Sequence, residues 1–134
     1  MDMEITFPGG KKVDALWKGF TIKTDQAHHY GGDASEPAPF DLFLASIGTC
    51  AGIYVLSFCQ ERNLPTDGLK LIQRLEKDVE AKRIKRIIIE IILPAGFPEK
   101  YKKTVIRSAD LCAVKKYMHE PPEFVITSAI QGEE

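Results

Sequence analysis

The most informative part of this 134-residue chain is the stretch Pro39-Phe40-Asp41-Leu42-Phe43-Leu44-Ala45-Ser46-Ile47-Gly48-Thr49-Cys50. We expect it to open a helix that extends to about Asn63, because proline suits a first helical turn and Leu64-Pro65-Thr66-Asp67-Gly68 would end the helix. No charged residue occurs from Leu42 to Cys59. A helix that is apolar almost all round must be covered on more than one side. We therefore expect this helix to form the axis of the fold.

The same segment must be weighed as a membrane span, since 18 uncharged residues are the lower limit for crossing a bilayer. Three features argue against a span. The segment contains Ser46, Thr49 and Ser57, Asp41 precedes it, and no cluster of lysine or arginine flanks it. The sequence therefore predicts a helix inside a soluble core and no membrane partner.

Charge and cysteine content narrow the class of protein. The chain has 18 Lys plus Arg against 19 Asp plus Glu, a net charge of −1, so nothing attracts it to a nucleic acid. It has three cysteines and begins Met1-Asp2-Met3-Glu4, without the basic start and apolar run of a signal peptide. We expect a cytoplasmic protein. His28-His29 has no third ligand at metal-site spacing, so neither a metal nor a cofactor is expected.

The remaining sequence predicts strands and helices in groups rather than in strict alternation. We expect a three-stranded meander over residues 2–8, 11–17 and 20–24, a loop over 25–39, a hairpin over 69–79 and 83–93, a helical stretch over 99–118 broken near Asp110, and a last strand over 124–130. This grouping indicates an α+β fold with antiparallel sheet. The length indicates one domain, residues 1–134.

Small residues on the long helix suggest a close neighbour. Gly48 and Gly52 are four residues apart, with Ala45 and Ala51 nearby. The neighbour could be the same helix of a second subunit. Packing against the chain's own sheet is the alternative, and the sequence favours neither.

The cysteines differ in their local surroundings. Cys59 lies nine residues after Cys50, on the opposite face of the same helix, and reads as a core residue. Cys50 is surrounded by small residues but lies about three turns into the helix, too deep for the helix dipole to activate it. A cation or a hydrogen-bond donor from elsewhere in the chain would have to help, and Lys23, His28 and His29 are the candidates. Cys112 could begin a helix capped by Asp110, which on local electrostatics alone would make Cys112 the more reactive thiol.

Taken together, these residues resemble the OsmC/Ohr family of thiol peroxidases. The resemblance rests on residues 39–50, on Arg62-Asn63-Leu64-Pro65 and Gly68-Leu69, and on Leu111-Cys112-Ala113-Val114, which is similar to the family's second cysteine site, normally Cys-Pro-Val. The separation of 62 residues between Cys50 and Cys112 is also similar to the family's.

The resemblance implies an intertwined homodimer, with the long helices at its centre and antiparallel sheets wrapped around them. It implies that Cys50 is the peroxidatic cysteine and Cys112 the resolving cysteine. The substrate would be an organic hydroperoxide, and a dithiol, lipoyl-linked in parts of the family, would reduce the resulting disulfide.

Two departures point to a less characterised branch of this family. The peroxidase branches carry a glutamate ten residues before the first cysteine, where this chain has Phe40, followed by Asp41. Those branches also use an upstream arginine, and here no arginine precedes Arg62. The alternative to an enzyme is therefore a small-ligand-binding or redox-sensing module with oxidisable thiols. The paired cysteines favour the enzyme, and the missing arginine favours the module.

Overall fold

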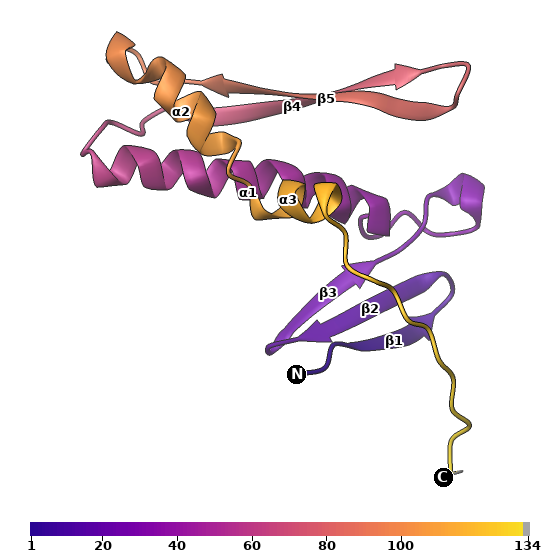
Figure 1. Ribbon diagram of the computed structural model, residues 1–134. Coiled ribbons are helices and arrows are strands. Elements are labelled where there is room, and N and C mark those ends of the chain that lie inside the picture. Colours follow the sequence, from indigo (N-terminus) through magenta and orange to yellow (C-terminus); the bar gives the residue numbers. More distant parts are fainter. Residues whose placement is uncertain (133–134) are drawn as a thin grey trace. The chain divides into compact units, whose positions relative to one another are not determined.

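The computed structural model describes residues 1–132 and divides into two compact units, Met1–Thr49 and Cys50–Glu134. The division falls inside the longest element, helix α1 (Pro39–Glu61), so α1 begins in one unit and ends in the other (Figure 1). The elements form an α+β fold with antiparallel sheets, as the sequence predicts.

The first unit contains the predicted meander. Strands β1 (Glu4–Gly9), β2 (Lys12–Trp17) and β3 (Phe20–Thr24) form an antiparallel sheet in the order β1-β2-β3. The turn between β2 and β3 is Lys18-Gly19, and both residues have positive φ, 51° and 84°. Two positive φ angles are what a two-residue hairpin turn requires, because they match the twist of the strands.

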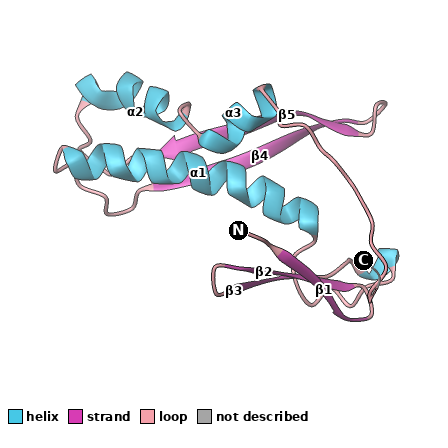
Figure 2. Ribbon diagram, turned by 60° about the horizontal axis from the view of Figure 1, so that its bottom comes forward, coloured by secondary structure: helices cyan, strands magenta, loops and turns pink. Residues whose placement is uncertain are grey.

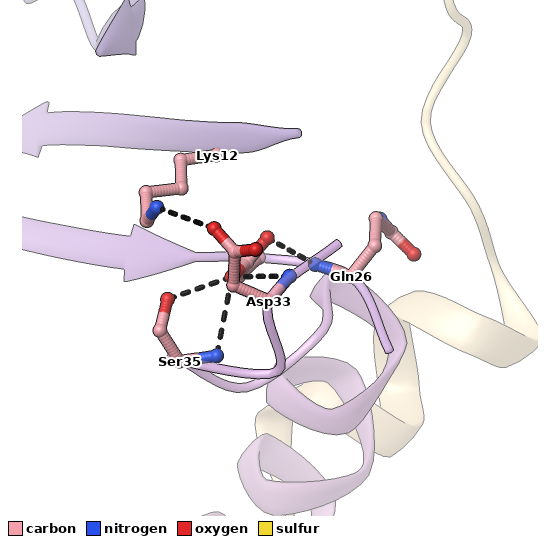
Figure 3. A network of polar contacts seen from close by, with 5 residues as sticks. Lys12, Gln26, Asp33 and Ser35 are labelled. Carbon is pink, nitrogen blue, oxygen red and sulfur yellow. Dashed lines mark hydrogen bonds and ion pairs between the residues drawn. The ribbon is translucent and has the colours of Figure 1, made fainter. Parts of the chain in front are cut away.

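A buried carboxylate organises the loop that follows β3. Asp25 is fully buried, and its oxygens accept N–H groups from Gln26 (2.7 Å), Asp33 (3.3 Å) and Ser35 (3.1 Å) and the hydroxyl of Ser35 (2.7 Å). Figure 3 shows this network, together with the ion pair between Lys12 and Asp33. These bonds hold the pKa of the Asp25 carboxyl far below its usual range, led by the Ser35 hydroxyl. The loop, which includes the short 3-10 helix η1 (His28–Tyr30), is therefore an ordered structure.

The second unit contains the C-terminal part of α1 from Cys50 onward, a hairpin and three further helical elements. Strands β4 (Lys70–Asp78) and β5 (Arg83–Ile92) pair in antiparallel fashion, and the 3-10 helix η2 (Glu99–Tyr101), α2 (Lys102–Ala109) and α3 (Ala113–His119) come next. The core of this unit is made of Val55, Phe58, Cys59, Phe97 and Val105. Leu71 and Ile91, which face each other across the hairpin, pack against that core.

The C-terminal end of α1 has a specific termination. Asn63 adopts a left-handed conformation with φ of 53°, and the N–H of Leu64 donates to the carbonyl of Cys59 at 2.9 Å. This is the Schellman arrangement, in which the chain satisfies its own last helical carbonyls. Arg62 adds a donor to the carbonyl of Phe58 and stacks on that ring at 3.7 Å. The predicted end of the helix, near Asn63, is confirmed to within two residues.

Two predictions about the C-terminal part are wrong. Residues 121–130 form no strand, and Figure 2 draws them as loop. Phe124, Val125, Ile126 and Ile130 are all highly exposed. Asp110 is not the N-cap of a helix either. It ends α2, and Cys112 is the N-cap of α3.

Several large side chains of α1 remain exposed within this chain. Phe40, Phe43 and Ile53 are 55%, 38% and 54% exposed. By length and composition α1 could cross a membrane, a test that the core helix of a soluble protein also passes. The placement of α1 at the centre of a dimer stays a prediction.

Candidate functional site

Two cysteines interact in the second unit. The side chains of Cys50 and Cys112 act on each other's pKa, which agrees with the proximity expected from the sequence. Both are free thiols, Cys112 fully buried and Cys50 partly exposed. Cys59 is buried in the core cluster with Val55 and Phe58 instead.

The beginning of α3 supplies further donors to Cys50. Backbone N–H groups of Val114 and Ala113 donate toward the Cys50 sulfur. These are the first residues of α3, and the first N–H groups of a helix have no partner within it. No side chain caps this helix start by hydrogen bonding. The Cys50 sulfur therefore serves as the acceptor for the start of α3.

The pKa values of the two thiols are shifted in opposite directions. The N–H of Val114 is the main cause that lowers the pKa of Cys50; the Cys112 thiol and the N–H of Ala113 add to it, and burial opposes it. Burial is the main cause that raises the pKa of Cys112; the Cys50 sulfur also raises it, while the N–H groups of Lys115 and Val114 oppose it. The pKa of Cys50 is thus shifted downward and that of Cys112 upward. This reverses the ranking that local electrostatics at Cys112 suggested.

Lys23, His28 and His29, the candidates for activating Cys50, belong to the first unit, and their part in activating Cys50 stays a prediction. Asp41 caps the start of α1, because its carboxylate accepts the N–H of Ala38 at 2.9 Å. The activating groups are main-chain N–H groups, which residue identity does not reveal. The sequence does predict a break in this helical stretch near Asp110. In the structure α2 ends there, but the N-cap of the next helix is Cys112.

Nothing in the described residues resembles a metal centre. Across residues 1–132, no group of three or more His, Cys, Asp and Glu side chains is arranged to hold a metal ion. His28 and His29 are exposed neighbours on η1, and the ring of His29 lies 4.1 Å from that of Tyr30. The chemistry that the site offers is that of a thiolate beside a thiol.

Comparison with known proteins shows the family and supports the fold. The chain matches the profile of the OsmC-like protein family over residues 32–127, and it belongs to that family. The matched region contains both Cys50 and Cys112. No curated protein matches the chain.

Two solved structures share the fold. One is a Psychrobacter arcticus protein named for osmotic stress induction and a detoxification response, with a TM-score of 0.70, 20% identity, and coverage of 85% of each chain. A second structure, from structural genomics, has a TM-score of 0.66 and 18% identity and covers 90% of this chain and 91% of its own. At such low identity the likeness concerns the fold alone.

Proposed function

We propose that this protein is a thiol-dependent peroxidase that reduces organic hydroperoxides, with Cys50 as the peroxidatic and Cys112 as the resolving cysteine. One observation supports the proposal: within one unit, hydrogen bonding led by the Val114 N–H lowers the pKa of the partly exposed Cys50, and burial raises the pKa of Cys112. Such a pair combines a ready nucleophile with a second thiol positioned to react with its product.

The reaction has three steps. The Cys50 thiolate attacks one oxygen of the hydroperoxide, the O–O bond breaks, and the products are an alcohol, after protonation, and a Cys50 sulfenic acid. Cys112 then attacks the sulfenic sulfur, and a disulfide forms as water leaves. An external dithiol reduces that disulfide by exchange, giving back both thiols while it becomes a cyclic disulfide itself.

The surroundings of Cys50 favour an organic substrate over hydrogen peroxide. Cys50 is followed by the buried Ala51 on α1, and Val114 contacts its sulfur from α3. Apolar walls suit the alkyl group of an organic hydroperoxide.

The test is consumption of cumene hydroperoxide with dihydrolipoamide as reductant. Wild type should turn over many equivalents, Cys50→Ser none, and Cys112→Ser at most one. Cys59→Ala, which alters a cysteine outside the pair, should keep the wild-type rate. Hydrogen peroxide should be consumed more slowly than cumene hydroperoxide.

The same experiment separates the enzyme from the redox-sensing alternative. A sensor would form the Cys50–Cys112 disulfide once with peroxide and show no sustained consumption. A wild type that oxidises stoichiometrically but does not turn over would therefore replace the peroxidase assignment.

We also propose a homodimer. Phe40, Phe43 and Ile53 of α1 are 55%, 38% and 54% exposed in the single chain. Large apolar side chains on one element are typical of a surface that a partner covers. A dimer would give α1 the cover that its composition requires, without a membrane.

A further inference from the structure

We propose that Asp110 and Lys115 are positioning residues for the resolving cysteine. The ion pair between their side chains joins the end of α2 to the first turn of α3, and it holds Cys112, which lies between them in the chain, ready to close onto Cys50. The proposal deepens the function proposed above and rests on it for the role of Cys112. Neither charged residue takes part in the chemistry itself.

Cys112 lies in a short break between two helices. After the last turn of α2, the N–H of Asp110 donates to the carbonyl of Arg107 at 3.1 Å. Cys112 then takes an extended conformation, with φ of −50° and ψ of 122°, and α3 follows. Its side chain is fully buried, whereas that of the neighbouring Leu111 is 52% exposed. The place of the Cys112 sulfur therefore depends on how this break is held.

An ion pair spans the break. The ammonium group of Lys115 donates to the carboxylate of Asp110, five positions earlier in the chain. Asp110 is the C-cap of α2, and Lys115 is the third residue of α3, so the two charges belong to different helices. The main-chain N–H of Lys115 also opposes the raised pKa of Cys112. The pair thus fixes the break from both of its ends.

Helix electrostatics does not explain why these charges lie where they do. The C-terminal end of a helix disfavours a carboxylate, and the N-terminal end disfavours an ammonium group. Asp110 and Lys115 are each at the less favourable end of their own helix. Only the pairing across the break offsets this. A role in helix stability and a role in positioning therefore predict opposite effects when either charge is removed.

The test follows the two thiols separately with dithiodipyridine, a neutral disulfide reagent, in the full-length protein carrying Cys59→Ala. The Cys50 thiolate attacks the reagent, whose S–S bond breaks, and one thiopyridone leaves. Cys112 then attacks the mixed disulfide, and a second thiopyridone leaves as the Cys50–Cys112 disulfide forms. The first phase of release depends on reagent concentration, and the second phase, which is intramolecular, does not.

Lys115→Met and Asp110→Asn should leave the first phase unchanged and slow the second about two- to fivefold. This is the range that an exposed ion pair is worth, and the two side chains are 44% and 70% exposed. The double variant Asp110→Lys/Lys115→Asp restores a pair and should recover the wild-type second phase. Lys116→Met removes the same charge from the exposed neighbouring position and is the matched control. At about 1 M salt, wild type should slow toward the single variants.

Thermal melting separates positioning from general stability. Neither single variant should melt below wild type, because each loses a charge that its helix end disfavours. A slower second phase that comes with a lower melting temperature would overturn the proposal. Equal second phases in all variants would do the same, as would a second phase that stays slow in the charge-reversed double variant.

The reagent is not a peroxide, so the two proposals fail separately. The expected pattern of second phases in a protein that consumes no peroxide would sink the proposed function and leave the role of the ion pair intact. Sustained peroxide turnover with equal second phases would overturn the role of the ion pair alone.

Discussion

Hydrogen bonding from the Cys112 side chain is one cause that lowers the pKa of Cys50, although 62 positions of sequence separate the two residues. The donor is buried and its pKa is raised, whereas the acceptor is partly exposed and its pKa is lowered. In the reduced protein, the pKa values of the two thiols are therefore shifted in opposite directions. In one chain, the more accessible sulfur is also the one that ionises more readily.

This polarity predicts the pH dependence of thiol labelling. The labelling rate of Cys50 should rise with pH with a midpoint below that of a free thiol, about 8.5, since only the thiolate reacts. The midpoint of Cys112 should lie above that value. Cys112→Ala removes the S–H donor and should raise the Cys50 midpoint, while Cys112→Ser keeps a donor and should raise it less. Equal midpoints for Cys50 and Cys112 in wild type would contradict the assignment of nucleophile.

The open space at Gly52 allows a test of the dimer. Because an added side chain would meet no atom of its own chain within 4 Å, Gly52→Leu should leave the fold of one chain intact. If a second α1 approaches this face, the variant should weaken the dimer at least tenfold, as seen by light scattering over a dilution series. Gly48→Leu should behave in the same way, and Ala81→Leu, in the exposed hairpin turn, is the control. A monomeric wild type would remove the basis for the dimer.

The Asp25 carboxylate should matter for the loop that it holds. Asp25→Asn replaces an oxygen acceptor by an amide donor facing N–H groups, so the variant should melt at a lower temperature than wild type at pH 7. The lowered pKa means that stabilisation by Asp25 is present above the unfolded carboxyl value, about 3.9, and is lost as pH falls through the folded value. The difference between wild type and variant should therefore shrink in strong acid. Asp33→Asn, which alters an exposed carboxylate paired with Lys12, should cost much less.

The core of the second unit can be tested at Val105, which is fully buried on α2. Val105→Ala removes two methyl groups from the cluster around Phe58 and Phe97, and it should lower the free energy of unfolding by about 2 kcal/mol in urea titrations. Thr104→Ala makes a similar change in helix propensity at the exposed neighbouring position. A loss at Thr104 as large as that at Val105 would mean that Val105 is not in a packed core.

Much of the fold was predictable because its signals are local. Pro39 and the uncharged run after it indicated α1, and the alternation in residues 69–79 and 83–93 indicated the hairpin. The prediction of a strand at 124–130 was wrong. β-branched and aromatic residues favour the extended conformation, but a strand also needs a neighbouring strand to pair with. The loop anchor was missed for a related reason. Asp25 bonds to residues up to ten positions away, so no short pattern contains the network.

The side chains of the candidate site can be named from the sequence, but its main-chain groups cannot. Cys50 and Cys112 were named through the family resemblance, and a cation or donors from elsewhere were expected, with Lys23, His28 and His29 as candidates. Hydrogen bonding from the main-chain N–H of Val114, whose side chain carries no charge, is the main cause that lowers the pKa of Cys50. Main-chain donors appear only when the start of a helix is placed against a particular atom.

The contact of Ala113 and Val114 with the Cys50 sulfur also bears on the reduction potential of the dithiol. The two N–H groups favour an anionic sulfur, and that anion exists in the reduced form but not in the disulfide. Every donor that stabilises the thiolate therefore makes the disulfide a stronger oxidant. A stabilised Cys50 thiolate would be available to react with peroxide. Its disulfide could then be reduced by a dithiol that is itself only a moderate reductant. The first turn of α3 would therefore assist both the oxidation and the reduction of Cys50.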